Sequence, residues 1–506
     1  MLLPTADEMA EIDREAVRSG AICERSLIEN AGREVARLTQ ARFPRGPVVV
    51  LAGSGHNGAD GLVAGRTLAA AGRPVRLVSC GSRVPEPDVL AGWDLPVVSA
   101  PDGFDRALAG AEVILDGILG TGLVSEPRGT QAEAIAACLR ASAPVVAVDG
   151  PSGVNFTTGE VHGDALNAAM TVTFGWPKSG LLRWPARARC GDLLCAEIGF
   201  PSTSPPSGAA LAPARVITTS WAASILGERS PTAHKGRAGY LAIVAGRRGM
   251  AGAALLAARA ALRAGAGVVQ VISDPSNRMI IQALVPEAVF VNCRDSGAAR
   301  AACERSRAVV VGPGLGRDDT ARELLEAAMS CCVGSALIDA DGLNLLAERA
   351  QPFQRPTRGL LLTPHPGEMA RLCGLSISEV QAGREDAAIA LARQMAASVL
   401  LKGAPSIVAS PRRRLRVTPL ASPAFAAGGT GDVLSGVCGA YLAAGLRPAD
   451  AATAALAVTG VAVTGVDAPV GLSSADIPDL IPAARRSVER ADPGGWPGVR
   501  LALPAA

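Results

Sequence analysis

Short apolar runs alternate with longer amphipathic stretches along the whole chain. Runs of strand length occupy 47–53, 75–80, 112–118, 144–150, 170–175 and 193–200 in the first half, and 240–246, 268–273, 308–314, 336–342, 360–364 and 398–403 in the second. Strands that are apolar throughout are typical of parallel sheets buried on both faces. The pattern predicts an α/β protein in which helices cover both faces of each sheet.

Helix signals agree with this arrangement. Thr5 is followed three positions later by Glu8, which forms a capping box and predicts a helix start. A second helix is predicted over 27–43, where one stripe carries Leu27, Ile28, Ala31, Val35 and Leu38. In the second half, helices are predicted over 251–265, 320–330 and 429–445.

The length of 506 residues exceeds what a single hydrophobic core usually holds, so more than one domain is predicted. Residues 201–214 are rich in proline, serine and alanine without a period, which is typical of a linker. We therefore predict a first domain over 1–212 and a second over 223–495.

Composition and charge exclude several classes of protein. Apolar residues make up 49% and charged residues 19%, which is typical of a folded chain. A net charge of +3 without a basic patch argues against nucleic acid or anionic lipid as a partner. No apolar stretch reaches spanning length, no secretory leader is visible, and the eleven cysteines lack metal-ligand spacing. We expect a cytoplasmic protein without a nucleic-acid or membrane partner.

Lysine is rare in this chain. Only Lys178, Lys235 and Lys402 occur beside 46 arginines, so arginine supplies the general surface charge. A compact ammonium near phosphate is one reason to retain lysine, and chance is the other explanation.

The turn Gly428-Gly429-Thr430-Gly431-Asp432 carries the strongest chemical signal. Its glycines allow close approach to a ligand, and a helix is predicted to begin at once, so its first N–H groups form an anion site. Asp432 in the first helical turn would lie beside a bound phosphate, where it could act as a base on a substrate hydroxyl. The alternative is that Asp432 only interacts with the helix dipole.

Four further segments accompany this turn in the second half. They read HKGRAG at 234–239, GPGLG at 312–316, TPHPGE at 363–368 and LKGAPS at 401–406. Together they resemble the ADP-dependent NAD(P)H-hydrate dehydratase domain, a branch of the ribokinase-like superfamily, over residues 225–490. The resemblance implies a C-terminal ribokinase-like α/β/α domain. It implies hydrate contacts for Ala253, Gly314, His365 and Asp432, nucleotide contacts for Lys402, Gly403, Ala404, Pro405, Ser406 and Gly431, and Mg²⁺ bound with ADP.

In the first half, three predicted strand ends carry glycines and oxygen-bearing side chains. They are GSGHNGADG at 53–61, the segment from Asp116 through LGTGL, and DGPSG at 149–153. This is not the GxGxxG fingerprint with a later acidic residue, so a plain NAD dehydrogenase is disfavoured. Carboxylate, hydroxyl and carbonyl oxygens suit a hard cation. The alternative is that Asp116 and Asp149 are only loop caps.

These segments resemble the NAD(P)H-hydrate epimerase domain over about residues 1–200, which implies an N-terminal Rossmann-like three-layer α/β/α sandwich. The family turn usually reads NNGGDG, whereas here His56 replaces an asparagine and Ala59 a glycine. The resemblance implies K⁺ ligation by Asn57, Asp116 and Ser152, and a catalytic role for Asp149. It implies a hydrate site lined by His56, Asn57, Gly58, Ala59, Asp60, Gly120, Thr121, Gly122, Leu123, Val124, Ser125, Glu126 and Asp149.

Both resemblances in this order are those of the bifunctional NAD(P)H-hydrate repair enzymes. They imply epimerisation of the R and S hydrates NADHX and NADPHX, and ADP-dependent dehydration of the S form to NAD(P)H, AMP and phosphate. The expected partners are these small molecules and further copies of the chain in a homo-oligomer. Two alternatives stay open at this point: a small-molecule kinase such as a hydroxymethylpyrimidine or thiazole kinase, and a non-catalytic binding scaffold.

Overall fold

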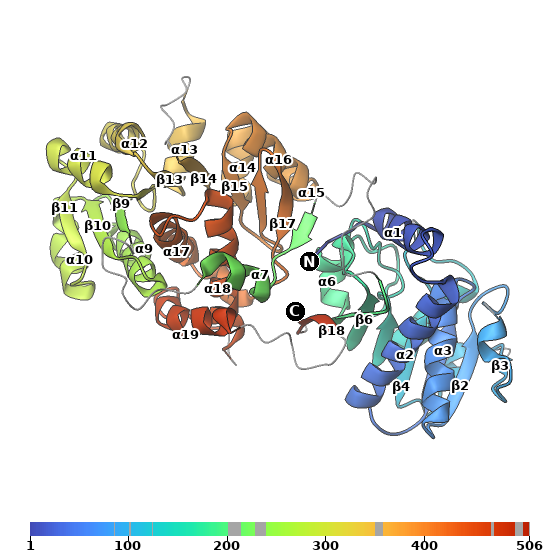
Figure 1. Ribbon diagram of the computed structural model, residues 1–506. Coiled ribbons are helices and arrows are strands. Elements are labelled where there is room, and N and C mark those ends of the chain that lie inside the picture. Colours follow the sequence, from blue (N-terminus) through green and yellow to red (C-terminus); the bar gives the residue numbers. More distant parts are fainter. Residues whose placement is uncertain are drawn as a thin grey trace. The chain divides into compact units, whose positions relative to one another are not determined.

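The computed structural model divides the chain into two compact units, whose elements are labelled in Figure 1. The first unit comprises Met1–Ala214 and Pro493–Ala506, and the second comprises Arg215–Asp492. The structure describes residues 1–85, 87–100, 103–123, 125–200, 214–227, 239–349, 358–466, 470–490 and 499–504. Outside these ranges lie residues 201–213 of the linker predicted at 201–214, together with Lys235 and Val124.

The first unit contains an eight-stranded sheet in the order β18-β7-β6-β5-β4-β1-β2-β3. All neighbouring strands are parallel except β18, which pairs antiparallel with β7. The strands are β1 Val48–Ala52, β2 Val75–Ser79, β3 Val97–Val98, β4 Val113–Gly117, β5 Val145–Val148, β6 Met170–Phe174, β7 Asp192–Ala196 and β18 Val499–Leu503. The six strands predicted in this half are confirmed, whereas the two edge strands β3 and β18 were not predicted.

Helices cover both faces of this sheet. They are α1 Ala6–Arg18, α2 Glu24–Arg42, α3 His56–Ala70, α4 Phe104–Leu108, α5 Thr130–Arg140 and α6 Ala186–Arg189, with 3₁₀ turns η1 Pro87–Leu90 and η2 Ser179–Leu182. Side chains alternate across β1, so Val48 and Val50 pack in one core with α1, α2 and α3. Val49 and Leu51 pack in another core with α4 and α5.

The predicted start of the chain's first helix is confirmed in detail. Thr5 is the N-cap of α1: its hydroxyl accepts the Glu8 N–H at 3.2 Å, and the Glu8 carboxylate accepts the Thr5 N–H at 2.8 Å. The apolar stripe of α2 is buried as its spacing predicted, with Val35 and Leu38 fully shielded from solvent. These helices therefore stand where the sequence pattern placed them.

The second unit contains a ten-stranded sheet in the order β11-β10-β9-β12-β13-β14-β15-β16-β17-β8. Strands from β11 to β15 run parallel, and β16 and β17 continue the sheet antiparallel. The strands are β8 Ala214–Val216, β9 Tyr240–Val244, β10 Val268–Ser273, β11 Val289–Asn292, β12 Ala308–Val311, β13 Ser335–Ile338, β14 Gly359–Leu362, β15 Ser398–Leu401, β16 Ile407–Ser410 and β17 Arg413–Val417. The six predicted strands are confirmed, and the additional ones extend the sheet at its two edges.

The helices of this unit pack on a core that is rich in alanine. They are α7 Thr219–Leu226, α9 Ala251–Ala264, α10 Arg278–Leu284, α11 Ser296–Arg305, α12 Asp319–Cys331, α13 Asp341–Ala347, α14 Pro366–Cys373, α15 Ile377–Ala382, α16 Arg384–Gln394, α17 Thr430–Ala443, α18 Pro448–Thr464 and α19 Ile477–Glu489, with 3₁₀ turns η3 Pro275–Asn277 and η4 Pro423–Ala426. Leu241 and Ile243 face α9, α17, α18 and α19. Ala242 and Val309, which point to the other face, are buried too, so the sheet is covered on both sides.

The unit boundaries differ from the predicted domains in two places. The second unit begins at Arg215 and its sheet includes β8, whereas the prediction began that domain at 223. The chain's last strand, β18, joins the sheet of the first unit, so this unit is built from both ends of the sequence. A pairing between segments some three hundred residues apart leaves no local signal in the sequence, which is why it was missed.

Candidate active sites

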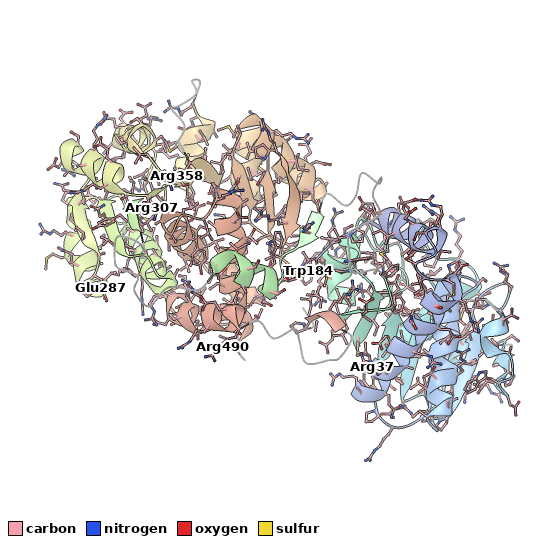
Figure 2. All side chains as sticks on the ribbon, in the orientation of Figure 1. Arg37, Trp184, Glu287, Arg307, Arg358 and Arg490 are labelled. Carbon is pink, nitrogen blue, oxygen red and sulfur yellow. The ribbon has the colours of Figure 1, made fainter. Side chains whose placement is uncertain are left out.

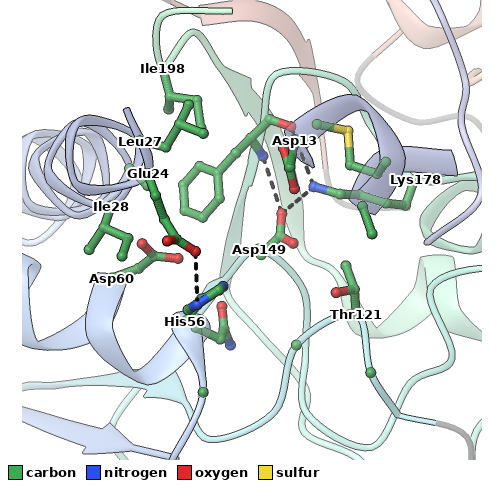
Figure 3. A pocket seen from close by; sticks show the side chains of 18 of the residues that line it. Asp13, Glu24, Leu27, Ile28, His56, Asp60, Thr121, Asp149, Lys178 and Ile198 are labelled. Atoms are coloured by element: carbon green, nitrogen blue, oxygen red, sulfur yellow. Dashed lines mark hydrogen bonds and ion pairs between the residues drawn. The ribbon is translucent and has the colours of Figure 1, made fainter. Parts of the chain in front are cut away.

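A pocket of about 920 Å³ opens in the first unit beyond the carboxyl ends of β1, β4 and β5 (Figure 3). Parallel sheets place their ligand sites at this end, because the loops there converge. Side chains from α1, α2 and the start of α3 form one wall. The sequence-predicted residues that line the pocket are His56, Asn57, Asp60, Gly120, Thr121, Gly122, Leu123 and Asp149.

Asp149 is held in the pocket wall by a buried cation. It follows β5 directly with a φ of 64°, a left-handed conformation that turns its side chain toward β6. Its Oδ1 accepts hydrogen bonds from the Thr173 hydroxyl at 3.0 Å, from the Phe174 N–H at 3.2 Å and from the Lys178 ammonium. Lys178 is 1% exposed, so the pair is shielded from water. This arrangement fixes Asp149 in position and stabilises its negative charge.

Two more carboxyl groups share the pocket with Asp149. Burial is the main cause that raises the pKa of Asp13 to about 6, and Lys178 partly opposes this shift. Burial also raises the pKa of Asp60 well above its ordinary value, and the charges of Asp149 and Asp13 add to that shift. With Glu24, four carboxyl groups and the Lys178 ammonium therefore line the same cavity, an arrangement suited to proton transfer.

The three predicted potassium ligands meet around the backbone of Leu119. Asp116, fully buried at the end of β4, accepts the Ser152 hydroxyl at 2.6 Å and the Ser152 N–H at 2.8 Å. The Asn57 amide donates to the Leu119 carbonyl at 2.8 Å, and the Leu119 N–H donates to the Ser152 hydroxyl at 3.0 Å. The Asn57 Oδ1 is buried without a hydrogen-bond partner among the described residues. An unpartnered buried oxygen, linked through Leu119 to a hydroxyl that donates to a carboxylate, fits a hard cation.

Other residues of the predicted epimerase set lie outside the pocket lining. Ala59 is fully buried in the helix core, and a side chain at Gly58 would collide with the Gly53 carbonyl. Ser125 and Glu126 lie beyond the lining on the loop after β4. His56 does line the pocket; its side chain is exposed, and its Nε2 lies 3.3 Å from Glu24 Oε1 on α2.

In the second unit, charged side chains gather where the parallel strands end. Asp339 follows β13 and is buried, and its Oδ1 lies 2.7 Å from the ammonium of Lys402, which follows β15. The other oxygen of Asp339 accepts the Ser435 hydroxyl of α17 at 2.6 Å. Lys402 Nζ also lies 4.0 Å from Glu368 Oε2 on α14. One lysine therefore faces two carboxylates and lies largely out of solvent.

The glycine-rich turn places Asp432 beside this lysine. Gly429 is the N-cap of α17 with a φ of 89°, a conformation that favours glycine. A Cβ atom on Gly431 would lie 3.4 Å from Lys402 Nζ, so the turn passes directly over the ammonium. Burial, together with the charges of Asp339 and Asp341, raises the pKa of Asp432 to about 7, and Lys402 opposes the shift. A carboxyl group with this pKa is suited to accept a proton near neutrality.

His365 begins helix α14 at the same edge of the sheet. Its Nδ1 accepts the Gly367 N–H at 2.9 Å, and the Glu368 carboxylate accepts the His365 N–H at 2.8 Å, which completes a capping box. Burial and the charge of Lys402 lower the pKa of His365, which favours the neutral ring, and its Nε2 lies 3.4 Å from Glu368 Oε1. Burial raises the pKa of Glu368 to about 7.

The predicted nucleotide loop is shaped by buried contacts. Gly403 has a φ of 137°, and the Ser406 hydroxyl donates to the Gly403 carbonyl at 2.9 Å. The Arg384 guanidinium donates to the carbonyls of Lys402 at 3.0 Å and Pro405 at 2.9 Å. The Lys402 side chain extends from this loop to the turn at Gly431.

Ala253 and Gly314 lie together on the GPGLG side of this edge. A Cβ on Gly314 would stand 3.0 Å from the Ala253 methyl group, so only glycine leaves the space between them open. The Gly316 N–H donates to Asp341 Oδ2 at 2.8 Å, and the charge of Asp341 in turn acts on Asp432. Asp341 therefore lies between the GPGLG segment and the charge of Asp432.

Comparisons with known proteins match both units of the chain. A family model described as NAD(P)H-hydrate dehydratase matches residues 241–482, and one described as YjeF-related protein N-terminus matches residues 24–180. The bifunctional NAD(P)H-hydrate repair enzyme Nnr of Coxiella burnetii is 35% identical over 94% of this chain and 97% of its own length. The enzyme of that name from Escherichia coli is 33% identical over 96% of this chain and 93% of its own. The chain belongs to the bifunctional NAD(P)H-hydrate repair enzymes.

The fold of the second unit also occurs in a solved structure. A ribokinase-like superfamily protein from Enterococcus faecalis superposes with a TM-score of 0.52 at 21% identity, and the match covers 56% of this chain and all of that one. The ribokinase-like fold predicted for the second half of this repair-family member is thereby confirmed. Among the residues that the structure describes, no helix is long and apolar enough to cross a membrane.

Four residues of these two sites were not assigned to a site by the sequence analysis. Asp13 and Lys178 line the first pocket, and Asp339 and Glu368 surround Lys402 in the second unit. Lys178 carried a signal, since it is one of only three lysines. Arginines such as Arg358 and Arg490, labelled in Figure 2, are exposed, whereas Lys178 is buried in an ion pair. Asp339 lies in the predicted strand 336–342 and Glu368 in the TPHPGE segment, but their neighbours in the sequence do not distinguish them from carboxylates exposed to solvent.

Proposed function

We propose that the two units carry out the two steps of NAD(P)H-hydrate repair. The first unit interconverts the R and S forms of NADHX and NADPHX. The second unit uses ADP to dehydrate the S form to NADH or NADPH, with release of AMP and phosphate. The observation that carries this proposal is the Lys402 ammonium, which lies largely out of solvent between Asp339 and Glu368 and beside the turn that begins α17. The same chain also holds the Asp149 pocket.

For the dehydration, Asp432 is the proposed base. It accepts the proton of the ring hydroxyl as the hydroxyl oxygen attacks the terminal phosphorus of ADP and the bond to AMP breaks. Phosphate then leaves with the C–O bond electrons, the neighbouring carbon loses a proton, and the ring double bond returns. Phosphate is a far better leaving group than hydroxide, which explains why a kinase-like fold serves a dehydration. The N–H groups at the start of α17 and the Lys402 ammonium stabilise the phosphate charge.

Two ions belong to this proposal. Mg²⁺ bound with ADP would neutralise phosphate charge, and phosphate oxygens would provide much of its coordination. Among the described residues no group of three or more acidic, histidine or cysteine side chains is arranged to hold a metal. K⁺ fits the first unit, where the Asn57 oxygen is buried without a partner and Leu119 links Asn57 to the Ser152–Asp116 pair. Bound there, K⁺ would fix the loops after β4 and β5 that form the pocket.

For the epimerisation, Asp149 is the proposed residue that assists ring opening. Its carboxylate, held by Lys178 in the pocket wall, orients the ring of the hydrate. We also propose a cytoplasmic location, because all eleven cysteines are unpaired. Assembly into a homo-oligomer remains a prediction.

The test incubates the purified chain with mixed R and S hydrates, ADP, Mg²⁺ and K⁺. Complete recovery of dihydronicotinamide absorbance is the expected result, since it needs both activities. Consumption of the S fraction alone would show that the first unit is inactive. A stable phosphorylated product without NAD(P)H would instead indicate a small-molecule kinase and would overturn the dehydratase assignment.

A further inference from the structure

Helix α1 presents one face to the epimerase pocket. Met9, Asp13 and Val17 are four residues apart, so they lie on one row of the helix, and all three line the cavity. Asp13 is the one carboxylate on that row. Its neighbours on other faces of α1 are neutralised locally, because Glu11 and Glu15 form ion pairs with the arginines three positions later.

Asp13 has no partner of its own in the described part of the chain. The three hydrogens of the Lys178 ammonium are directed to Asp149, to the Thr173 hydroxyl at 3.1 Å and to the Phe174 carbonyl at 3.4 Å. Lys178 therefore has no N–H left for Asp13, which takes neither a hydrogen bond nor an ion pair from the described residues. Figure 3 shows Asp13 reaching down from α1 toward Asp149 and Lys178. A half-buried carboxyl group without a donor, aimed into a cavity, is free to bind and exchange a proton with a ligand.

We propose that Asp13 is a catalytic residue of the epimerase site, where it carries a proton between the hydroxyl and the ring nitrogen of the hydrate; this rests on the function proposed above. The hydroxyl oxygen and the ring nitrogen are bonded to the same carbon, so the two oxygens of one carboxylate can reach both. Asp13 accepts the hydroxyl proton as the carbonyl bond forms and the carbon–nitrogen bond breaks. It then donates that proton to the nitrogen, which has received the bond electrons.

The product of this step is an aldehyde with an open ring. Rotation about the adjacent carbon–carbon bond presents the other face of the aldehyde to the nitrogen. Ring closure then reverses the proton transfer through Asp13 and gives the opposite epimer. No oxidant or reductant is needed, and Asp13 ends as it began. Asp149 remains paired with Lys178 throughout and orients the ring.

The acidity of the pocket groups separates their roles. Burial holds the pKa of Asp60 well above the ordinary range, and the charge of Asp149 adds to this shift. Burial raises the pKa of Asp13 to about 6, which is close to neutrality and suits repeated proton exchange. The charged and titratable groups that act on Asp13 are Lys178, Asp149, His56, Arg14 and Asp60.

The experiment measures interconversion of purified R hydrate to S hydrate without ADP, by chiral chromatography, for the full chain and its variants. Asp13→Asn should lower kcat by about 100-fold or more with little change in KM, which is the usual contribution of a proton-transfer group. The rate of the unsubstituted chain should fall below about pH 6, and the variant should lose this fall. Asp13→Glu should retain part of the activity, since it keeps the carboxyl group.

Asp7→Asn is the matched control, because Asp7 is an exposed aspartate on the same helix. It should epimerise at the rate of the unsubstituted chain, and ADP-dependent dehydration of S hydrate should be unchanged in every variant. If Asp13→Asn keeps its kcat, or changes only KM, the inference is wrong. If the unsubstituted chain fails to epimerise, the function proposed for the first unit is wrong instead, and the Asp13 inference is withdrawn with it.

Discussion

Replacement of Lys402 by methionine should convert the second site into one that works only at higher pH. The ammonium lies 2.7 Å from Asp339 and 4.0 Å from Glu368, and its charge also lowers the pKa of Asp432. At the 4.0 Å between the Lys402 ammonium and Glu368, two unit charges interact with about 4 kcal/mol at an effective dielectric constant near 20, and we take this as the scale of the Lys402 effect in this site. That energy corresponds to roughly 3 pKa units. The Lys402 side chain is 19% exposed, so solvent screens part of this interaction, and we expect a shift of about 1 to 2 units.

The assay is the pH dependence of ADP-dependent dehydration, followed by dihydronicotinamide absorbance. The pKa values of Asp432 and Glu368 are both about 7, so the unsubstituted chain should lose activity below this pH. In Lys402→Met the loss should begin about 1 to 2 units higher, because Asp432 stays protonated there. Rates at pH 7 should fall by about 10-fold or more.

Two controls separate this effect from a general loss of structure. Arg358→Met removes an exposed positive charge from the same unit and should leave the pH profile unchanged. Epimerisation of the R hydrate by Lys402→Met should also be unchanged, because Lys402 lies in the other unit. An unshifted pH profile, with only a higher KM for ADP, would refute the electrostatic reasoning and leave Lys402 as a nucleotide contact.

Three further predictions concern other parts of the molecule. Asp432→Asn should abolish dehydration and spare epimerisation. Burial raises the pKa of Asp432 from 3.8 to about 7, so its ionisation lowers the stability of the folded chain as pH rises from about 4 to 7. The variant should therefore have a higher Tm than the unsubstituted chain at pH 8 but not at pH 4. A residual dehydration rate in that variant would exclude Asp432 as the base. Asn57→Ala removes the unpartnered buried oxygen and should abolish stimulation of epimerisation by K⁺ over Na⁺, and persistence of the K⁺ effect would place the ion elsewhere. Deletion of 499–506 removes β18 and exposes the edge of β7, so the first unit should melt at a lower temperature in calorimetry while the dehydratase unit keeps its transition; an unchanged first transition would show that the strand adds little.

Much of the second site was accessible from sequence because its parts are local. The turn from Gly428 to Asp432 joins an anion site and a carboxylate within one short segment, and a helix start supplies the N–H groups. The alternation of apolar runs predicted the parallel strands, and parallel strands bring their carboxyl ends to one edge. Lys402 and Asp432, thirty residues apart, were therefore expected at the same place, and the structure brings them together.

The charged residues that surround the key side chains of both sites could not be predicted from local sequence. Asp339 pairs with Lys402 across two strands, and Asp13 reaches the first pocket from a helix that precedes the whole sheet. A carboxylate on an amphipathic helix has the same local pattern whether it faces solvent or a cavity. Only the packing of α1 over the strand ends makes Asp13 a pocket residue.

The sequence by itself determined the two parallel sheets, the order of their strands along the chain, and the turns that carry the phosphate and cation chemistry. These features follow from local periodicity and from backbone requirements that a few residues satisfy. The tertiary structure decided which charges lie within a few ångströms of one another, how deeply each is buried, and that the last strand completes the first sheet. Charge interaction and desolvation depend on distance in space and on neighbouring atoms, and neither quantity is encoded by separation along the chain.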